Sequence, residues 1–163
     1  MSTTLVRWAT RWDRTGLVAM VRALAQQHDW ETSEETIGAA FEYALGNPAR
    51  VRFAVAQRDD QLVGTASLHA AYSTWRAAPY GTIEDFYVVP DMRGQGVGTE
   101  LLGLLVEEAQ RRGYCRLQLQ VQEDNDRAWQ FYEARGFHFT GYLVYEQDLA
   151  DSDGAAGAEA NRP

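Results

Sequence analysis

A glycine-rich turn between a hydrophobic strand and a helix constrains this chain more than any other segment. Residues 82–89 (TIEDFYVV) are largely apolar on both faces, as is typical of a central strand, and Pro90 ends them. The segment Arg93–Thr99 (RGQGVGT) follows, and a helical pattern runs on to about Arg112. Strand, turn and helix in this order predict a crossover unit of an α/β sheet.

The same turn has the chemistry of a pyrophosphate site. Backbone N–H groups can approach an anion where glycines lack side chains, and the first N–H groups of a helix are unpaired. Arg93 adds a permanent, forked cation. The dinucleotide fingerprint G-x-G-x-x-G fails because Thr99 stands where the third glycine would fall. The nucleotide-binding P-loop fails because the chain has no lysine.

Composition excludes further classes of function. All fifteen basic residues are arginine, so neither a Schiff-base lysine nor a Ser-x-x-Lys nucleophile is available. With 23 acidic residues the formal net charge is −8, which disfavours nucleic acid or an anionic membrane as a partner. A single cysteine, Cys115, no signal-peptide pattern and no long apolar run predict a cytoplasmic protein. No histidine spacing suits a metal.

The chain length fits one domain, which we place at residues 1–149, while residues 150–163 predict a disordered tail. Hydrophobic periodicity and turn residues predict its elements. We expect helices at 13–27, 33–46, 97–112 and 125–135, a loop at 73–81, and strands at 5–9, 51–55, 62–71, 82–89, 115–121, 137–139 and 143–149.

Two motifs carry a resemblance to a known family. Arg93, Gly96 and Gly98 form the pattern Arg-x-x-Gly-x-Gly, and residues 125–137 (NDRAWQFYEARGF) form Asn-x-x-Ala-x-x-Phe-Tyr followed by Gly-Phe. In this order they resemble the two signatures of the GNAT superfamily of acetyl-CoA-dependent N-acetyltransferases. The resemblance implies a mixed α/β (α+β) fold. Its central sheet would be mostly antiparallel, with a splayed parallel pair in the middle and about four flanking helices.

The resemblance also implies where acetyl-CoA, the acetyl donor, would bind. The pantetheine arm would bond to main-chain groups of the central strand, and the glycine-rich turn would wrap the pyrophosphate. Asn125 would bond the pantetheine, or cap its own helix. The implied residues are Phe86, Tyr87 and Val88 on the strand, and Arg93, Gly94, Gln95, Gly96, Val97, Gly98 and Thr99 in the turn.

Two residues take catalytic roles by the same resemblance. Tyr132 would protonate the departing thiolate, and a phenol, which is protonated at neutral pH, can donate that proton. Glu84 would act as the base through a water molecule. A carboxylate inside an apolar strand is costly unless it is paired or faces a wet cleft, and a wet cleft could hold that water. The structural alternative for Tyr132 is an aromatic residue of the core, and the alternative for Glu84 is a carboxylate paired with an arginine. Strand alternation places Glu84 and Asp85 on opposite faces.

Candidate residues for the acceptor site are fewer. The central strand resembles that of the diamine and polyamine N-acetyltransferases, in which an aspartate near a tryptophan holds the cationic substrate. Trp75 stands near the tryptophan's place, but Thr74 replaces the aspartate. Trp30 and Glu31 belong to an acidic, aromatic loop that could recruit a cation, and Asp85 is a further candidate.

We therefore expect direct transfer of an acetyl group from acetyl-CoA to a primary amine of a small cationic acceptor. Acetylation of an aminoglycoside, an amino acid or a protein N-terminus is one alternative, and a non-catalytic acyl-CoA-binding module is another. Many members of the family that the chain resembles form dimers, so the resemblance implies a homodimer.

Overall fold

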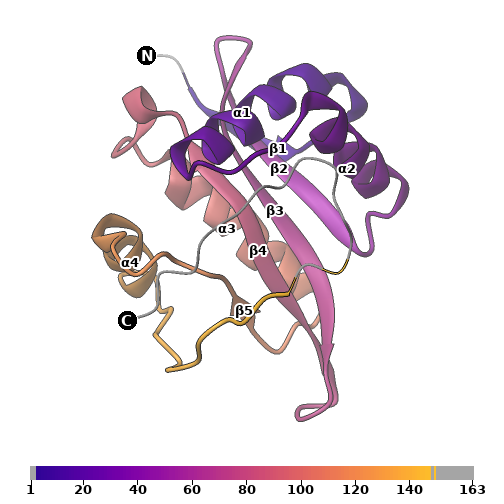
Figure 1. Ribbon diagram of the computed structural model, residues 1–163, viewed down its shortest axis with the longest axis vertical. Helices are drawn as coiled ribbons and strands as arrows, with labels where there is room; N and C mark the ends of the chain where they lie inside the picture. Colours follow the sequence, from indigo (N-terminus) through magenta and orange to yellow (C-terminus); the bar gives the residue numbers. More distant parts are fainter. Residues whose placement is uncertain (1–2, 148, 150–163) are drawn as a thin grey trace. The chain divides into compact units, whose positions relative to one another are not determined.

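The computed structural model describes residues 3–147 and 149 and divides them into two compact units, at Gln120 and Val121 (Figure 1). The first unit holds a five-stranded sheet in the order β1-β2-β3-β4-β5. Its strands are β1 (Leu5–Trp8), β2 (Val51–Arg58), β3 (Gln61–Ser73), β4 (Ala78–Val88) and β5 (Leu117–Gln118). Only the β4–β5 pair is parallel. The mixed, mostly antiparallel sheet with one parallel pair is what the resemblance implied, but in the described residues this pair lies at the edge of the sheet and not in its middle.

Three helices cover this sheet. Helices α1 (Arg14–Gln27) and α2 (Glu34–Gly46) lie on one face, and α3 (Val97–Arg111) lies on the other (Figure 1). Alternate residues of β2 explain the layers, because Phe53 and Val55 pack into the cluster under α1 and α2. The fully buried members of that cluster and of α3 include Leu17, Phe41, Val55, Leu101 and Leu105.

Local sequence explains where the helices begin. Ser33 caps α2, since its hydroxyl accepts the N–H of Thr36, and the helix begins where the sequence predicted. Asp13 precedes α1 but makes no side-chain cap to it. Its carboxylate instead accepts two hydrogen bonds from Arg7, at 2.7 and 2.8 Å, and the backbone N–H of Thr10. These bonds lower the pKa of the buried Asp13 carboxyl.

The hairpin between β3 and β4 is tighter than predicted. The loop expected at residues 73–81 shrinks to four residues, because Ser73 pairs with Ala78 and the ladder continues from there. The strand expected at 115–121 is correspondingly short, since its ladder has only two registered pairs. Among the described residues, no helix is long and apolar enough to span a membrane.

The second unit contains helix α4 (Asp126–Glu133), which matches the prediction for this segment. The strands predicted at 137–139 and 143–149 are wrong for the described residues, because 137–147 carry no strand. Alternating apolar residues predict a strand only if a ladder partner is present, and here Phe139, Tyr142, Leu143, Val144 and Tyr145 are exposed. The tail predicted at 150–163 lies outside the described residues.

Candidate active site

The glycine-rich turn has the backbone that the sequence implied. Gly94 and Gly96 have φ of 79° and 89°, which is the left-handed region that favours glycine. A Cβ atom at either position would meet nothing within 4 Å, so backbone conformation rather than crowding requires the glycines. No side chain caps the start of α3 at Gly96. An open, glycine-rich turn at the start of a helix fits an anionic ligand.

Two arginines lie at this turn. The Nε of Arg93 donates to the carbonyl of Val88 at 2.8 Å, and its Nη2 donates to Gln27 at 2.9 Å. Arg58, at the end of β2, donates to the side chain of Gln95 at 3.0 Å. Sequence reasoning missed Arg58, which lies 37 positions from Gln95 and reaches the turn only through the strand order of the sheet. Together the two guanidinium groups give the turn the positive charge that a pyrophosphate requires.

The ladder between β4 and β5 stops early. Gly81 pairs with Leu117 and Thr82 with Gln118, and no further pair follows. The segment Phe86–Val88 therefore lies beyond the last registered pair of this parallel ladder. This is the arrangement that the expected main-chain contacts of a pantetheine arm require.

A bulge in β4 changes the placement of the two carboxylates. The register shifts between the Thr65↔Tyr87 and Ser67↔Glu84 pairs, and Asp85 has φ of 51°. Regular alternation predicted that Glu84 and Asp85 point to opposite faces, and that prediction is wrong. The extra residue of the bulge turns Asp85 back toward the face that Glu84 occupies.

These two carboxylates share one pair of neighbours. The Ser67 hydroxyl donates to Asp85 at 2.8 Å and lies 2.9 Å from Nε2 of His69. That same nitrogen lies 3.6 Å from Oε2 of Glu84. Sequence reasoning missed Ser67 and His69, because nothing in the spacing of the strand expected at 62–71 relates them to the two acids. Cross-strand register is what brings them to the two acids.

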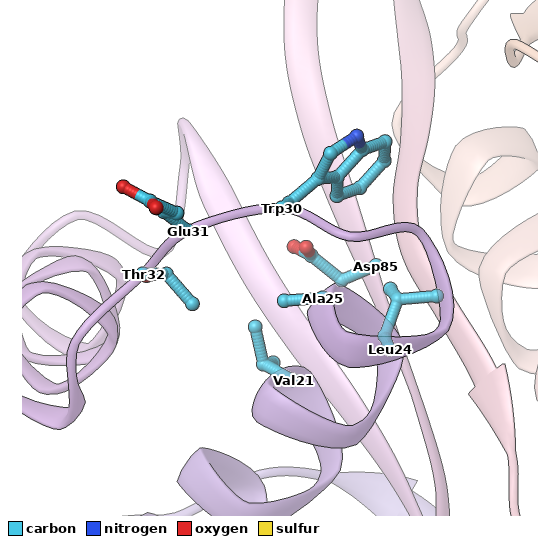
Figure 2. Close-up of a pocket in the computed structure, with 7 residues that line it drawn as sticks. All are labelled: Val21, Leu24, Ala25, Trp30, Glu31, Thr32 and Asp85. Atoms are coloured by element: carbon cyan, nitrogen blue, oxygen red, sulfur yellow. The ribbon is translucent and has the colours of Figure 1, made fainter. Parts of the chain in front are cut away.

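A pocket of about 220 Å³ opens beside Asp85. Its apolar wall comes from α1 and its rim from the loop that leads to α2; the lining residues are Val21, Leu24, Ala25, Trp30, Glu31, Thr32 and Asp85. Figure 2 shows the Asp85 carboxylate between Ala25 and Trp30, whereas the Glu31 carboxylate points away from it. The structure thus brings together three of the expected acceptor residues and makes Asp85 the inward-facing acid.

Trp75, the fourth expected acceptor residue, lies elsewhere. It occupies the turn between β3 and β4 and is 98% exposed. It does not line the pocket beside Asp85.

The second unit holds the remaining expected residues. The Asn125 side chain accepts the N–H of Ala128, so it caps α4, as one of its two expected roles required. Tyr132 is buried, and its ring packs edge-on against Phe131 and Phe137. Burial raises the pKa of the Tyr132 phenol, which keeps it protonated and able to donate.

Known proteins resemble this chain along most of its length. The Acetyltransferase (GNAT) family matches residues 7–137. The thialysine N-epsilon-acetyltransferase of Mus musculus is 30% identical over 166 residues, covering 94% of this chain and 90% of that protein. The aminoalkylphosphonate N-acetyltransferase of Salmonella typhimurium is 30% identical over 132 residues, covering 81% of this chain and 83% of that protein.

A solved acetyltransferase structure shares the fold of this chain. A solved structure of a predicted acetyltransferase with acetyl-CoA, from Clostridium acetobutylicum, is similar with a TM-score of 0.74. The match covers 89% of this chain and 96% of that one at 22% identity, so it supports the fold alone. Sequence motifs, turn geometry and these relatives agree: the chain belongs to the acetyltransferase (GNAT) family and is an N-acetyltransferase.

Proposed function

We propose that this N-acetyltransferase moves an acetyl group from acetyl-CoA to a primary amine of a small cationic acceptor, by direct attack within a ternary complex. The observation that carries the acceptor class is the pocket beside Asp85, where a carboxylate faces inward among apolar residues. A carboxylate in such surroundings attracts an ammonium group more strongly than it would in water. The aromatic rim at Trp30 adds a face suited to a cation.

Each of three titratable residues then has a role. Asp85 binds the ammonium, Glu84 removes the proton of the attacking amine through a water molecule, and Tyr132 protonates the departing thiolate. Glu84 suits the exchange of protons with solvent because its side chain is 56% exposed. The turn around Arg93 holds the pyrophosphate of coenzyme A, and the main chain of Phe86–Val88 holds its pantetheine arm.

The relatives' names narrow the acceptor when they are combined with the pocket's charge. One relative is named for thialysine and the other for aminoalkylphosphonates. An inward-facing carboxylate would repel a phosphonate near the reacting amine. We therefore favour an amine on a flexible cationic chain, such as a diamine or a thialysine-like molecule, over an aminoalkylphosphonate.

Two measurements on the purified protein test this function. Acetyl-CoA at 100 times its dissociation constant should stabilise the fold by about 2.7 kcal/mol, while NAD and ATP should give no thermal shift. Among acceptors, diamines and thialysine should be turned over with a lower KM than aminoalkylphosphonates, aminoglycosides or peptide N-termini. A preference for phosphonates or peptides would contradict the proposed acceptor, and no shift with any acyl-CoA would contradict the donor.

A matched pair of variants connects the acceptor preference to the pocket. Asp85→Asn should raise the KM for diamines about tenfold or more, since one charge-assisted contact is lost. Asp60→Asn should leave that KM unchanged: Asp60 also has a left-handed backbone, with φ of 62°, but lies in the β2–β3 turn. Equal effects of the two variants would contradict the role of Asp85.

We further propose a cytoplasmic homodimer that binds neither nucleic acid nor membrane. The family resemblance supports the dimer, and the net charge of −8 supports the absence of anionic partners. Sedimentation analysis should give about twice the 18.3 kDa chain mass, and a monomer at working concentration would contradict the dimer.

A further inference from the structure

A hydrogen-bonded chain runs from His69 through Ser67 to Asp85. Ser67 is completely buried on β3, and its hydroxyl contacts both Asp85 Oδ2, at 2.8 Å, and His69 Nε2, at 2.9 Å. His69 is partly exposed, and Glu84 Oε2 is 3.6 Å from the same imidazole nitrogen. Through the partly exposed His69 and the exposed Glu84, these four residues connect the pocket beside Asp85 to solvent.

The number of available protons sets the direction of this chain. A serine hydroxyl has one proton, and an ionised carboxylate can only accept. Ser67 therefore donates its proton to Asp85 and accepts a hydrogen bond from His69. This requires a proton on Nε2 of His69, in either the neutral or the charged imidazole.

The bulge makes such support necessary. Asp85 lies half-buried beside Leu24 and Ala25, where an ionised carboxylate loses part of its hydration. The bond from Ser67 engages Oδ2, and among the described residues Oδ1 accepts no hydrogen bond. One oxygen is thus anchored, and the other remains for the pocket.

We propose that Ser67 and His69 are positioning residues that hold the Asp85 carboxylate oriented toward the acceptor amine. His69 orients the Ser67 hydroxyl, and Ser67 fixes the rotamer of Asp85. This positioning role rests on the proposed function, whereas the hydrogen-bonded chain of His69, Ser67 and Asp85 does not. Ser67 and His69 therefore determine how tightly a cationic acceptor binds, without contacting it.

Nitrogen NMR of the histidine imidazoles tests the hydrogen-bonded chain without any measurement of turnover. The protein has only three histidines, so His69→Asn identifies the His69 signals. We expect a protonated Nε2 on His69, whose resonance shifts in Ser67→Ala and in Asp85→Asn while those of the other two histidines stay in place. An unprotonated Nε2, or a resonance that ignores both variants, would overturn the proposal.

Kinetics tests the positioning role. Ser67→Ala and His69→Asn should each raise the KM for the amine about tenfold, with the KM for acetyl-CoA unchanged. Neither change should add to Asp85→Asn, because residues that act through one carboxylate are not additive. The control is Ser73→Ala in the same strand, whose hydroxyl accepts the N–H of Arg76 and which should leave the amine KM unchanged.

The outcomes separate the two proposals. Additive losses in the double variants, or an unchanged amine KM in Ser67→Ala, would overturn the positioning role. A wild-type protein that acetylates no amine would overturn the proposed function, and the nitrogen spectra would still decide whether the hydrogen-bonded chain exists.

Discussion

Asp85 combines an uncommon backbone conformation with a functional position. A left-handed backbone costs a non-glycine residue roughly 1–2 kcal/mol, although aspartate tolerates it better than most. This unfavourable backbone conformation lies at the bulge of β4, and the bulge directs the Asp85 carboxylate into the pocket. Strain maintained beside a pocket is a common sign of function.

The two neighbouring acids should separate in a kinetic comparison. Glu84→Gln should lower kcat about 10²-fold or more, because a general base contributes that much, and should leave the amine KM nearly unchanged. Asp85→Asn should act mainly on the amine KM. Steady-state kinetics with a diamine and acetyl-CoA measures both; an unaltered kcat in Glu84→Gln would assign the base elsewhere.

Tyr132 gives the second prediction at this scale. Tyr132→Phe should lower turnover about 10²-fold while acetyl-CoA still binds, because the thiolate loses its proton donor. Burial raises the pKa of the phenol, so this residue should cause no loss of activity on the alkaline side of the pH profile. Unchanged turnover in a folded variant, checked by circular dichroism, would rule out the role.

At the scale of elements, the start of α3 should control binding of the donor. Gly96→Ala forces a Cβ into a conformation with φ of 89°, which costs about 1–2 kcal/mol and distorts the turn. We expect acetyl-CoA to bind about tenfold more weakly, as measured by calorimetry.

Gly103→Ala is the matched control for this prediction. Gly103 lies inside α3, and a Cβ there meets nothing within 4 Å. Alanine should raise the unfolding free energy by about 0.5–1 kcal/mol and leave acetyl-CoA binding unchanged. Equal affinities of Gly96→Ala and the wild type would contradict the role of the turn.

Helix α3 is also held to the sheet by a buried acid. Glu108 is 6% exposed and accepts hydrogen bonds from Arg111, Arg112 and Arg52, the last of which belongs to β2. These bonds lower its pKa from 4.5 to about 2. Because the folded-state pKa is the lower one, the stabilisation is complete above about pH 4.5 and disappears as the pH falls through about 2.

Glu108→Gln should therefore lose about 2–3 kcal/mol of unfolding free energy at pH 7. The difference from the wild type should shrink between about pH 4.5 and 2. Urea denaturation at several pH values measures it, with the exposed neighbour Glu107→Gln as the control. A difference that does not depend on pH would show that Glu108 stabilises by packing rather than by charge.

The elements that the sequence predicted correctly are those with local signals. Periodicity found α1, α2 and α3, glycine chemistry found the turn, and Asn125 marked α4. The predictions that failed concern features that depend on the pairing of strands. The late strands needed a ladder, the loop after β3 closed because its flanks pair, and the bulge at Asp85 appears only in the register with β3.

The residues of the candidate site divide in the same way, into those with a local signal in the sequence and those that depend on the tertiary fold. The motifs identified the glycine-rich turn, whose left-handed backbone at Gly94 and Gly96 depends on residues next to one another in the sequence. The contacts of Ser67 and His69 with Asp85 and Glu84 could not be predicted, since they depend on a cross-strand register that no single strand encodes. The contact of Arg58 with Gln95 depends on the tertiary fold.

At the scale of the whole molecule, the family match at residues 7–137 extends across both units. Composition helps the decisive assay: without lysine, the only primary amine of the chain is its N-terminus, so self-acetylation contributes little background.

Thiol release from acetyl-CoA in the presence of a diamine, with the product identified by mass, tests the proposed function most directly. We expect amine-dependent thiol release and a product heavier than the diamine by one acetyl group, both strongly reduced in Glu84→Gln. Thiol release that needs no amine, or no release with any amine by a protein that binds acetyl-CoA, would contradict it.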